Sequence, residues 1–276
     1  MGGGTSSYQE IEDTELIILW GSNARETHPI FFHHILKGVK RGAKLVVVDP
    51  RRTSSAQWAD EWLGVNVGSD ISLANAVARE IVVSGLENRK FINHATSGFK
   101  QYCDSIDSYT LKRAEAETGV PRTAIQNLAH SYAQSKRAQL CWTLGITEHH
   151  NAVDNVLALI NLSLLTGHVG RYGSGLNPLR GQNNVQGGGD MGALPDRLPG
   201  FQHVENNFLR AKFEKVWKVS IPSKGGLHLS GMFDSMEEKE LKVLYVIGEN
   251  PVSSEADQNK AQRLLKSLDC LVVQDV

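Results

Sequence analysis

Arg180 lies in a stretch with many hydrogen-bonding groups and few apolar residues. This stretch, residues 175–192, reads GLNPLRGQNNVQGGGDMG. Gly181 and Gln182 follow it, and glycine, asparagine and glutamine fill most neighbouring positions. A guanidinium group holds a carboxylate through two parallel hydrogen bonds. Surface arginines are common, but the backbone and amide dipoles around this one favour a bound anion. We therefore interpret Arg180 as a candidate binding residue for a small carboxylate.

Glycines and short polar residues follow the apolar runs of the chain. They stand at Gly21-Ser22-Asn23, Asp49-Pro50-Arg51, Gly68-Ser69-Asp70, Gly145-Ile146-Thr147-Glu148 and Gly248-Glu249-Asn250-Pro251. In open parallel sheets, ligands bind at the carboxyl ends of the strands. Glycine lets backbone N–H groups reach phosphate oxygens, and Asp49, at the end of the second strand, suits ribose hydroxyls. Together these positions predict a site for a nucleotide with phosphates.

Asp70 and the arginines after Asp49 extend this interpretation to the base. Asp70 has the acceptors for the ring N–H and amino group of guanine, and Arg51 or Arg52 suits a base or a phosphate. The alternative is structural: the glycines form turns, Asp49 caps a loop and Asp70 caps a helix. GSNARE, at 21–26, is not a GxGxxG fingerprint, and the chain has no Walker A lysine motif. This argues against an ordinary dehydrogenase or NTPase.

Buried strands alternate with helices in the first part of the chain. This alternation indicates βαβ units and predicts an α/β fold of Rossmann-like parallel-sheet units with flanking helices. We expect strands near 15–23, 43–53, 61–66 and 138–145, and helices near 29–41, 68–85, 88–95, 121–135 and 151–167.

Residues 168 to about 235 are rich in glycine, proline and asparagine, and we expect an irregular binding loop there. A strand at 241–251, a helix at 257–268 and a strand at 270–276 then resume the pattern. We predict a dinucleotide-binding α/β domain at 1–177. Residues 178–276 would hold the substrate and cofactor loop and the start of a second, incomplete α/β domain. The first and last residues suggest cut ends, so we expect a central segment of a larger polypeptide.

Composition excludes several classes of function. The net charge is −1, whereas a nucleic-acid-binding surface needs a basic excess. No apolar run has the length of a membrane span, and the N-terminus lacks the pattern of a secretory signal, so we expect a cytoplasmic protein. The 3 cysteines include no CxxC pair, which leaves no metal site, and Cys141 and Cys270 lie in apolar runs where we expect burial. His149 and His150 are adjacent, and we interpret them as polar loop residues rather than metal ligands.

Five segments resemble one known family. TGHVGRYGSGLNPLRGQNNVQGGGDMGALPD (166–196) is similar to the signature of the formate dehydrogenase α (catalytic) subunit, in the molybdopterin oxidoreductase family. The segments WGSNARETHP (20–29), VVVDPRRT (46–53), GSDISLANA (68–76) and VIGENPVSSEAD (246–257) match in the same order. The resemblance covers essentially the whole chain.

The resemblance implies a catalytic subunit that binds molybdenum or tungsten through two molybdopterin guanine dinucleotides and oxidises formate to carbon dioxide. By position, Arg180 matches the arginine that orients formate, and Gly181 and Gln182 lie beside a pterin. The implied cofactor-binding residues are Gly21, Asn23, Asp49, Arg51, Gly68, Asp70, Gly145, Thr147, Glu148, Gly248, Glu249 and Asp257. Relatives more often have Gln where this chain has Glu148, which adds a negative charge near the phosphates.

Other parts of the family pattern do not occur in this sequence. The four-cysteine motif is absent, so the four-iron four-sulfur cluster is expected in a preceding part of the protein. The cysteine or selenocysteine that ligates the metal is also absent, and we expect this chain alone to be inactive. Electron-transfer subunits, ferredoxin or an NAD-linked protein would be partners. The alternatives are a nitrate reductase, a formylmethanofuran dehydrogenase, or a non-catalytic relative such as the subunit of respiratory complex I.

Overall fold

The protein is described by a computed structural model that covers residues 3–255 and 257–276. The chain forms two compact units, a larger one that ends at Asn183 and a smaller one, Asn184–Val276. Residues 178–183, which the sequence assigns to the second domain, thus belong to the larger unit. Arg180 is therefore part of the unit that carries most of the predicted dinucleotide-binding residues.

A parallel sheet of five strands in the order β3-β2-β1-β4-β5 forms the centre of the larger unit. Its strands are β1 (Leu16–Trp20), β2 (Lys44–Val48), β3 (Glu61–Leu63), β4 (Ala138–Trp142) and β5 (Gly175–Pro178). β1 pairs with β2 on one side and β4 on the other, so the direction of strand progression reverses beside β1. Such a reversal is where open α/β sheets bind ligands, outside the carboxyl ends of the strands.

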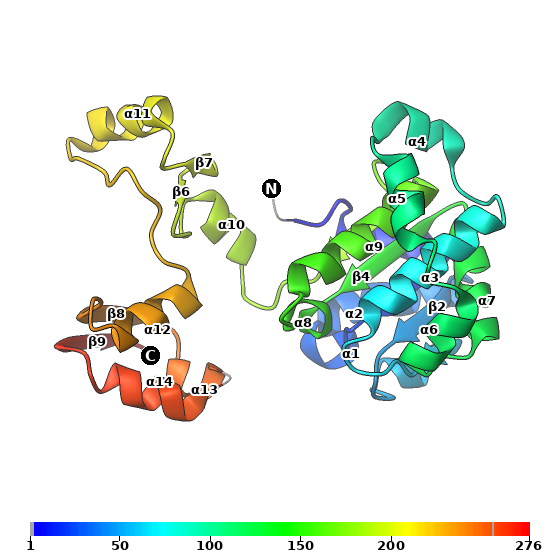
Figure 1. Cartoon of the computed structure of the whole chain (residues 1–276), viewed down its shortest axis with the longest axis horizontal. Helices are drawn as coiled ribbons and strands as arrows, with labels where there is room; N and C mark the ends of the chain where they lie inside the picture. Colours follow the sequence, from blue (N-terminus) through cyan, green and yellow to red (C-terminus); the bar gives the residue numbers. More distant parts are fainter. Residues whose placement is uncertain (1–2, 256) are drawn as a thin grey trace. The chain divides into compact units, whose positions relative to one another are not determined.

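Helices cover both faces of this sheet (Figure 1). One layer contains α3 (Asp70–Val83), α4 (Arg89–Ala95), α5 (Phe99–Ile106), α6 (Leu111–Thr118), α7 (Arg122–Gln134) and α9 (Ala152–Thr166). Ile18 and Leu140 of the sheet share a core with this layer. On the other face, Ile17 and Leu45 pack with Phe31 of α2 (Pro29–Lys40). Both faces are buried, which explains the uninterrupted apolar runs and confirms the predicted α/β fold.

The region after residue 168 is more ordered than the sequence indicates. It contains β5, α10 (Val185–Asp190), β6 (Arg197–Leu198), β7 (Gln202–His203), α11 (Asn207–Trp217) and α12 (Leu229–Glu237). The prediction of an irregular segment is therefore wrong there, and α5 and α6 were not anticipated. β5 was missed because its sequence, Gly-Leu-Asn-Pro, is a poor strand former. Its pairing with β4 overrides that local preference.

The smaller unit contains a parallel pair of strands, β8 (Val243–Ile247) and β9 (Cys270–Gln274). Leu244 packs with Phe233 and Met236 of α12 and with Leu264 of α14 (Gln258–Leu265). β9 is exposed at every position. The expectation that Cys270 is buried is therefore wrong, whereas Cys141 is buried as expected. An apolar run predicts a strand, but it does not say what covers that strand.

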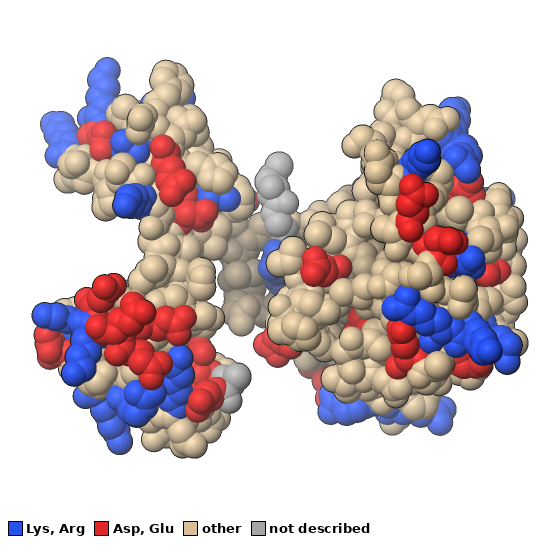
Figure 2. All heavy atoms as spheres, viewed as in Figure 1, with Lys and Arg blue, Asp and Glu red and all other residues tan. Residues whose placement is uncertain are grey.

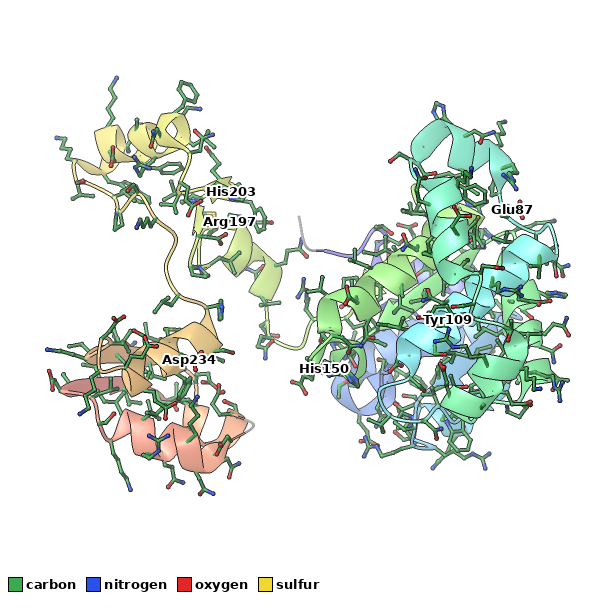
Figure 3. The ribbon with its side chains drawn as sticks, viewed as in Figure 1. Glu87, Tyr109, His150, Arg197, His203 and Asp234 are labelled. Carbon is green, nitrogen blue, oxygen red and sulfur yellow. The ribbon has the colours of Figure 1, made fainter. Side chains whose placement is uncertain are left out.

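The hairpin of β6 and β7 precedes α11 in the smaller unit (Figure 3). Arg197 lies 2.8 Å from His203 Nδ1 and also contacts Asp196. On α12, Asp234 accepts a hydrogen bond from Lys260 at 3.2 Å. Acidic and basic residues are interspersed on the visible surface of each unit (Figure 2). Among the described residues, no helix combines the length and apolarity that a bilayer span requires.

Candidate functional site

Gly21 and Gly145 bring the ends of β1 and β4 into direct backbone contact. Gly21 has φ +59°, and a Cβ there would lie 2.8 Å from the carbonyl carbon of Gly145. A Cβ on Gly145 would lie 2.6 Å from the carbonyl oxygen of Gly21. That oxygen accepts hydrogen bonds from Gly145 N at 3.2 Å and from Thr143 Oγ1 at 2.7 Å. Both glycines are thus required by the packing of the two turns at the reversal of strand order.

Asn23 joins the end of β1 to the loop after β2. Its Oδ1 accepts hydrogen bonds from the Ser55 amide at 3.2 Å, Ser55 Oγ at 2.9 Å and Ser54 Oγ at 3.1 Å. Ser22, immediately before it, is buried, and its hydroxyl has no hydrogen-bond partner among the described residues. A buried hydroxyl without a partner is costly. It is therefore a polar group available to a ligand at this turn.

Asp49 follows β2 and is largely buried. Its Oδ1 accepts a hydrogen bond from the Arg51 amide at 2.8 Å, the turn geometry that the structural alternative predicts. Its backbone oxygen accepts from Trp62 Nε1 at 2.9 Å. Burial raises the pKa of the Asp49 carboxyl above its ordinary value, while the Arg51 amide and guanidinium oppose the rise. The guanidinium of Arg51 therefore lies near this carboxylate, and Arg51 itself is exposed.

Asp70 begins α3 and is only 7% exposed. Its Oδ1 accepts a hydrogen bond from Trp20 Nε1 at 2.8 Å. Burial raises the pKa of Asp70, and the negative charge of Asp49 adds to the rise, whereas the Trp20 hydrogen bond and His149 lower it. Trp20 pairs with Val48, the residue before Asp49, and its side chain bonds Asp70, so both carboxylates lie at the same edge of the sheet. A buried carboxylate with a raised pKa is typical of functional sites.

The short helix α8 (Leu144–Thr147) follows β4 at this edge. Thr147 and Glu148 are exposed. His149 Nε2 lies 2.9 Å from the carbonyl oxygen of Gly145, so this nitrogen donates the hydrogen bond. His150 is exposed and labelled in Figure 3. No group of three or more potential metal ligands occurs within 3–255 and 257–276.

Arg180 follows β5 and is exposed. The Leu179 amide donates to the Trp142 carbonyl at 2.9 Å, which continues the pairing of β5 with β4. The carbonyl oxygen of Arg180 lies 2.7 Å from Nε2 of His28, between α1 (Ala24–Thr27) and α2. These contacts connect Arg180 to the end of β4 and to the junction of α1 and α2. Gly181 has open space where a side chain would be, and Gln182 is exposed.

Gly68 and the three candidate residues of the smaller unit make few contacts beyond local hydrogen bonds. Gly68 has φ +83° and open space around it. Gly248 has φ +61° and donates its amide hydrogen to Gln274 O at 2.9 Å. Glu249 Oε1 accepts from Ser254 Oγ at 2.6 Å. Asp257 Oδ1 accepts from the Lys260 amide at 2.9 Å and caps α14.

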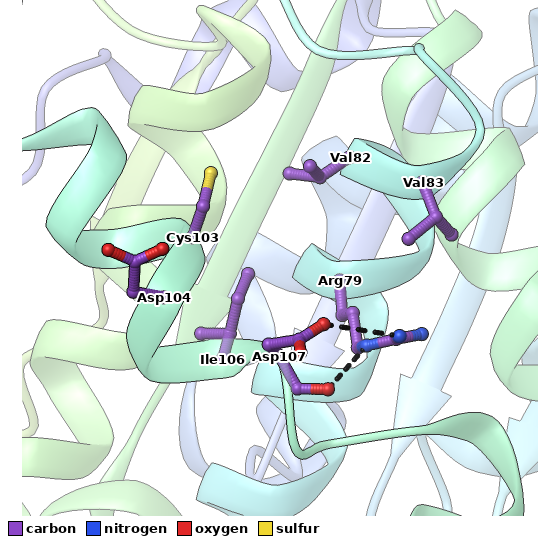
Figure 4. Close-up of a pocket in the computed structure, with 7 residues that line it drawn as sticks. All are labelled: Arg79, Val82, Val83, Cys103, Asp104, Ile106 and Asp107. Atoms are coloured by element: carbon purple, nitrogen blue, oxygen red, sulfur yellow. Dashed lines mark hydrogen bonds and ion pairs between the residues drawn. The ribbon is translucent and has the colours of Figure 1, made fainter.

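A separate hollow lies between α3 and α5, within the helical layer (Figure 4). Its lining includes Val82, Cys103, Arg79 and Asp107. Arg79 Nε donates to Asp107 O at 2.7 Å, and its guanidinium pairs with the Asp107 carboxylate. Burial raises the pKa of the Cys103 thiol, which disfavours a reactive thiolate. None of the predicted site residues lines this hollow.

Four residues that contact the candidate site residues at the carboxyl ends of the strands were not predicted as site residues. They are Trp20, His28, Ser55 and His149. The sequence predicts only a polar loop residue at His149, and Trp20 ends the apolar run of β1. The Trp20 and His28 contacts bridge 50 and 152 positions of sequence. Nothing in the local pattern predicts such pairings. A histidine followed by proline at a helix start, as at His28, is the only local signal near them.

Comparison with known proteins identifies the family. The profile described as molybdopterin oxidoreductase matches residues 3–276. The whole chain aligns with the F420-dependent formate dehydrogenase subunit alpha of Methanocaldococcus jannaschii at 40% identity and with formate dehydrogenase H of Escherichia coli at 36%. The chain spans 40% of the first relative's length and 39% of the second's.

The solved structure of acetylene hydratase from Pelobacter acetylenicus is also similar. Its TM-score is 0.75 at 21% identity, covering 99% of this chain and 40% of the hydratase chain. At this identity the likeness shows the fold alone. The sequence comparisons confirm the resemblance drawn from the five segments, and the chain belongs to the molybdopterin oxidoreductase family.

Proposed function

We propose that this chain is the central part of a formate dehydrogenase catalytic subunit, which oxidises formate to carbon dioxide at a molybdenum or tungsten centre. The observation that carries the proposal is the hydrogen bond between His28 and the Arg180 carbonyl. It brings the candidate formate-binding arginine to the junction of α1 and α2, in the segment that follows β1. Asp49 and Asp70 both lie beside Trp20, at the carboxyl end of the sheet. The names of the two formate dehydrogenase relatives support the substrate.

The residues at this edge fit a guanine dinucleotide of molybdopterin. Ser22 offers a buried hydroxyl without a partner among the described residues, and Gly68 leaves open space at its Cβ position. Asp49 would hold ribose hydroxyls, and Arg51 would neutralise phosphate. Asp70 would accept from guanine while its Oδ1 keeps the Trp20 hydrogen bond. Gly145, Thr147 and Glu148 would border the phosphates, with Gly21 and Asn23 shaping the turn.

Arg180 would bind the carboxylate of formate through paired N–H groups and so fix its orientation. Gly181 and Gln182 would lie beside a pterin. When bound, the metal cofactor accepts the electrons released as formate becomes carbon dioxide. This chain would orient the substrate and supply the positive charge that pairs with its carboxylate.

The smaller unit would supply contacts to the second guanine dinucleotide. Gly248, Glu249 and Asp257 are the proposed residues, by their match to the family pattern. A four-iron four-sulfur cluster would supply electron transfer in the intact enzyme, and an electron-transfer subunit, a ferredoxin or an NAD-linked protein would be its partner.

Analysis of the native protein tests the proposal. Elemental analysis is expected to find molybdenum or tungsten at about one atom per chain, and acid hydrolysis of the extracted cofactor should release GMP. Enzymatic assay should show formate-dependent reduction of a viologen dye. A protein without either metal, or one whose released nucleotide is not GMP, would contradict the cofactor assignment. Metal and GMP without formate oxidation would keep the cofactor and remove the substrate.

A further inference from the structure

We propose that His28 is a positioning residue that holds the backbone of Arg180 in place. This inference rests on the proposed function only in that Arg180 binds formate. His28 Nε2 lies 2.7 Å from the carbonyl oxygen of Arg180. A carbonyl oxygen only accepts, so Nε2 carries the proton and donates it to this bond. The imidazole thus contacts the same residue whose guanidinium is the candidate for binding substrate, but from its backbone side.

The ring and backbone of His28 are both fixed. Its Nδ1 lies 2.8 Å from Thr27 Oγ1, and that hydroxyl lies 3.2 Å from the carbonyl oxygen of Asn23. The His28 amide donates to Ala24 O at 2.9 Å, and its carbonyl accepts from Phe32 N at 2.9 Å. His28 therefore sits at the junction of two helices with little freedom to move. A residue that contacts a ligand-binding residue in this way fixes its orientation without contacting the ligand itself.

The backbone after β5 needs an anchor of this kind. The pairing of β5 with β4 ends with the Leu179 amide and the Trp142 carbonyl. Gly181 comes next, and glycine populates many backbone conformations. A guanidinium fork binds a carboxylate well only when its direction is set, and small misplacements cost rate. The His28 bond fixes the carbonyl between the end of the strand and this glycine.

Limited proteolysis tests the anchor without any catalytic assay. Trypsin cleaves after arginine, and the exposed Arg180 makes the 180–181 bond a direct reporter of local opening. In the purified protein, His28→Ala should speed cleavage at this bond roughly fivefold, the effect of one lost hydrogen bond. His28→Gln keeps a side-chain N–H donor and should cleave close to the wild-type rate. Cleavage after Arg122, followed in the same digest, should not change.

His33→Ala is the matched control, because His33 is exposed on α2, the helix that His28 precedes. The thermal unfolding midpoint of each variant separates local opening from loss of the fold. Thr27→Val removes the hydroxyl beside Nδ1 and should speed cleavage at 180–181 by less than His28→Ala does. Equal cleavage rates at this bond in wild type and folded His28→Ala would overturn the inference.

Kinetics on the cofactor-loaded native enzyme test the link to Arg180. His28→Ala should lower kcat/KM for formate roughly fivefold, and His28→Gln should restore most of it. In an Arg180→Ala background, His28→Ala should have no further effect, because both changes act through one group. The same loss in both backgrounds would overturn the positioning role. If Arg180→Ala left formate oxidation unchanged, the proposed substrate site would fail, while faster cleavage in His28→Ala would still support the anchor.

Discussion

The turns after β1 and β8 share a glycine and an asparagine at matching positions, but their surroundings differ. WGSN (20–23) and IGEN (247–250) each place a glycine after a strand, with φ +59° at Gly21 and +61° at Gly248. Gly21 is packed against the backbone of Gly145, whereas Gly248 has open space at its Cβ position. The local sequence therefore sets the strand and the turn. Whether that turn is packed depends on neighbours far away in the chain.

The strands before these turns differ in the same way. β1 is buried at every position, between helices on both faces of its sheet. β8 is exposed at alternate positions, with one side on α12 and α14. The core of the smaller unit consists of Phe233, Met236, Ala261, Leu264 and Leu265. We infer that the larger unit supplies most of the stability of this chain.

A matched pair of isoleucines gives the largest expected contrast. Ile17 in β1 is fully buried, and Ile247 in β8 is 62% exposed. Ile17→Ala should lower the free energy of unfolding by about 2–5 kcal/mol through lost contacts and the cavity left behind. Ile247→Ala should change it by less than about 0.5 kcal/mol. Urea unfolding followed by circular dichroism measures both, and similar costs would contradict the contrast between the units.

Alanine substitutions at Gly21 and Gly248 compare a packed turn with an open one. Gly248→Ala should cost about 1–2 kcal/mol, because only the left-handed conformation opposes the added methyl group. Gly21→Ala should cost about 1–3 kcal/mol more, because its Cβ would lie 2.8 Å from the Gly145 carbonyl carbon and force the two turns apart. Differential scanning calorimetry of the two variants gives the difference. Equal destabilisation would mean that the contact between Gly21 and Gly145 is not tight.

His168 makes the larger unit sensitive to acid. Its Nε2 donates to Tyr132 O at 2.7 Å and Arg171 approaches its Nδ1 at 2.9 Å, so the buried ring is held neutral. Burial lowers the pKa of His168 from 6.5 to about 4. The unfolded chain therefore binds more protons in this interval, and stability is lost as pH falls from 6.5 toward about 4.

The expected slope from this one group approaches ~1.4 kcal/mol per pH unit. His168→Gln retains a donor for Tyr132 O and should flatten the pH dependence of the unfolding free energy in that window. His94, on α4, is exposed, so His94→Gln serves as the control and should leave the slope unchanged. An unaltered slope in His168→Gln would show that other groups govern the acid sensitivity.

The smallest expected effect is a gain in stability at the candidate site. Burial and the charge of Asp49 raise the pKa of Asp70, so the ionised form is disfavoured in the folded state. Asp70→Asn keeps an acceptor for Trp20 and removes the buried charge. Its thermal midpoint at neutral pH should exceed that of wild type by a few degrees, while Asp104→Asn, at an exposed position, should not change it. A lower midpoint for Asp70→Asn would mean that the carboxylate stabilises the fold.

The fold of the larger unit was largely predictable because its strands are continuous apolar runs. Leu16–Trp20 and Lys44–Val48 lie inside the predicted ranges 15–23 and 43–53. β5 was not predictable, since it depends on pairing with β4 and on the contact of the Thr5 amide with Leu176 O at 2.9 Å. In the smaller unit, the strands were predicted but their exposure was not.

The candidate site was predictable in its residue types and less so in its contacts. Parallel strands bring their carboxyl ends to one edge, so the proximity of Asp49 and Asp70 follows from topology. The partners of these groups come from distant positions. Trp20 reaches Asp70 because the last residue of β1 faces α3, and His28 reaches Arg180 because β5 ends near α1. Such contacts require the three-dimensional packing and cannot be predicted from spacing.

The role of Arg180 in orienting formate is tested most directly by steady-state kinetics. The measurement compares the native cofactor-loaded enzyme with its Arg180→Lys variant. Lysine keeps the positive charge but loses the paired N–H groups that hold a carboxylate. We expect kcat/KM for formate to fall roughly ten- to a hundredfold, because one charge-assisted bond of about 1.5–3 kcal/mol is lost. Arg122→Lys, at an exposed helical position, should retain wild-type kinetics with the same metal content. A near-wild-type kcat/KM for a metal-loaded Arg180→Lys enzyme would contradict the assignment of Arg180 as the residue that orients formate.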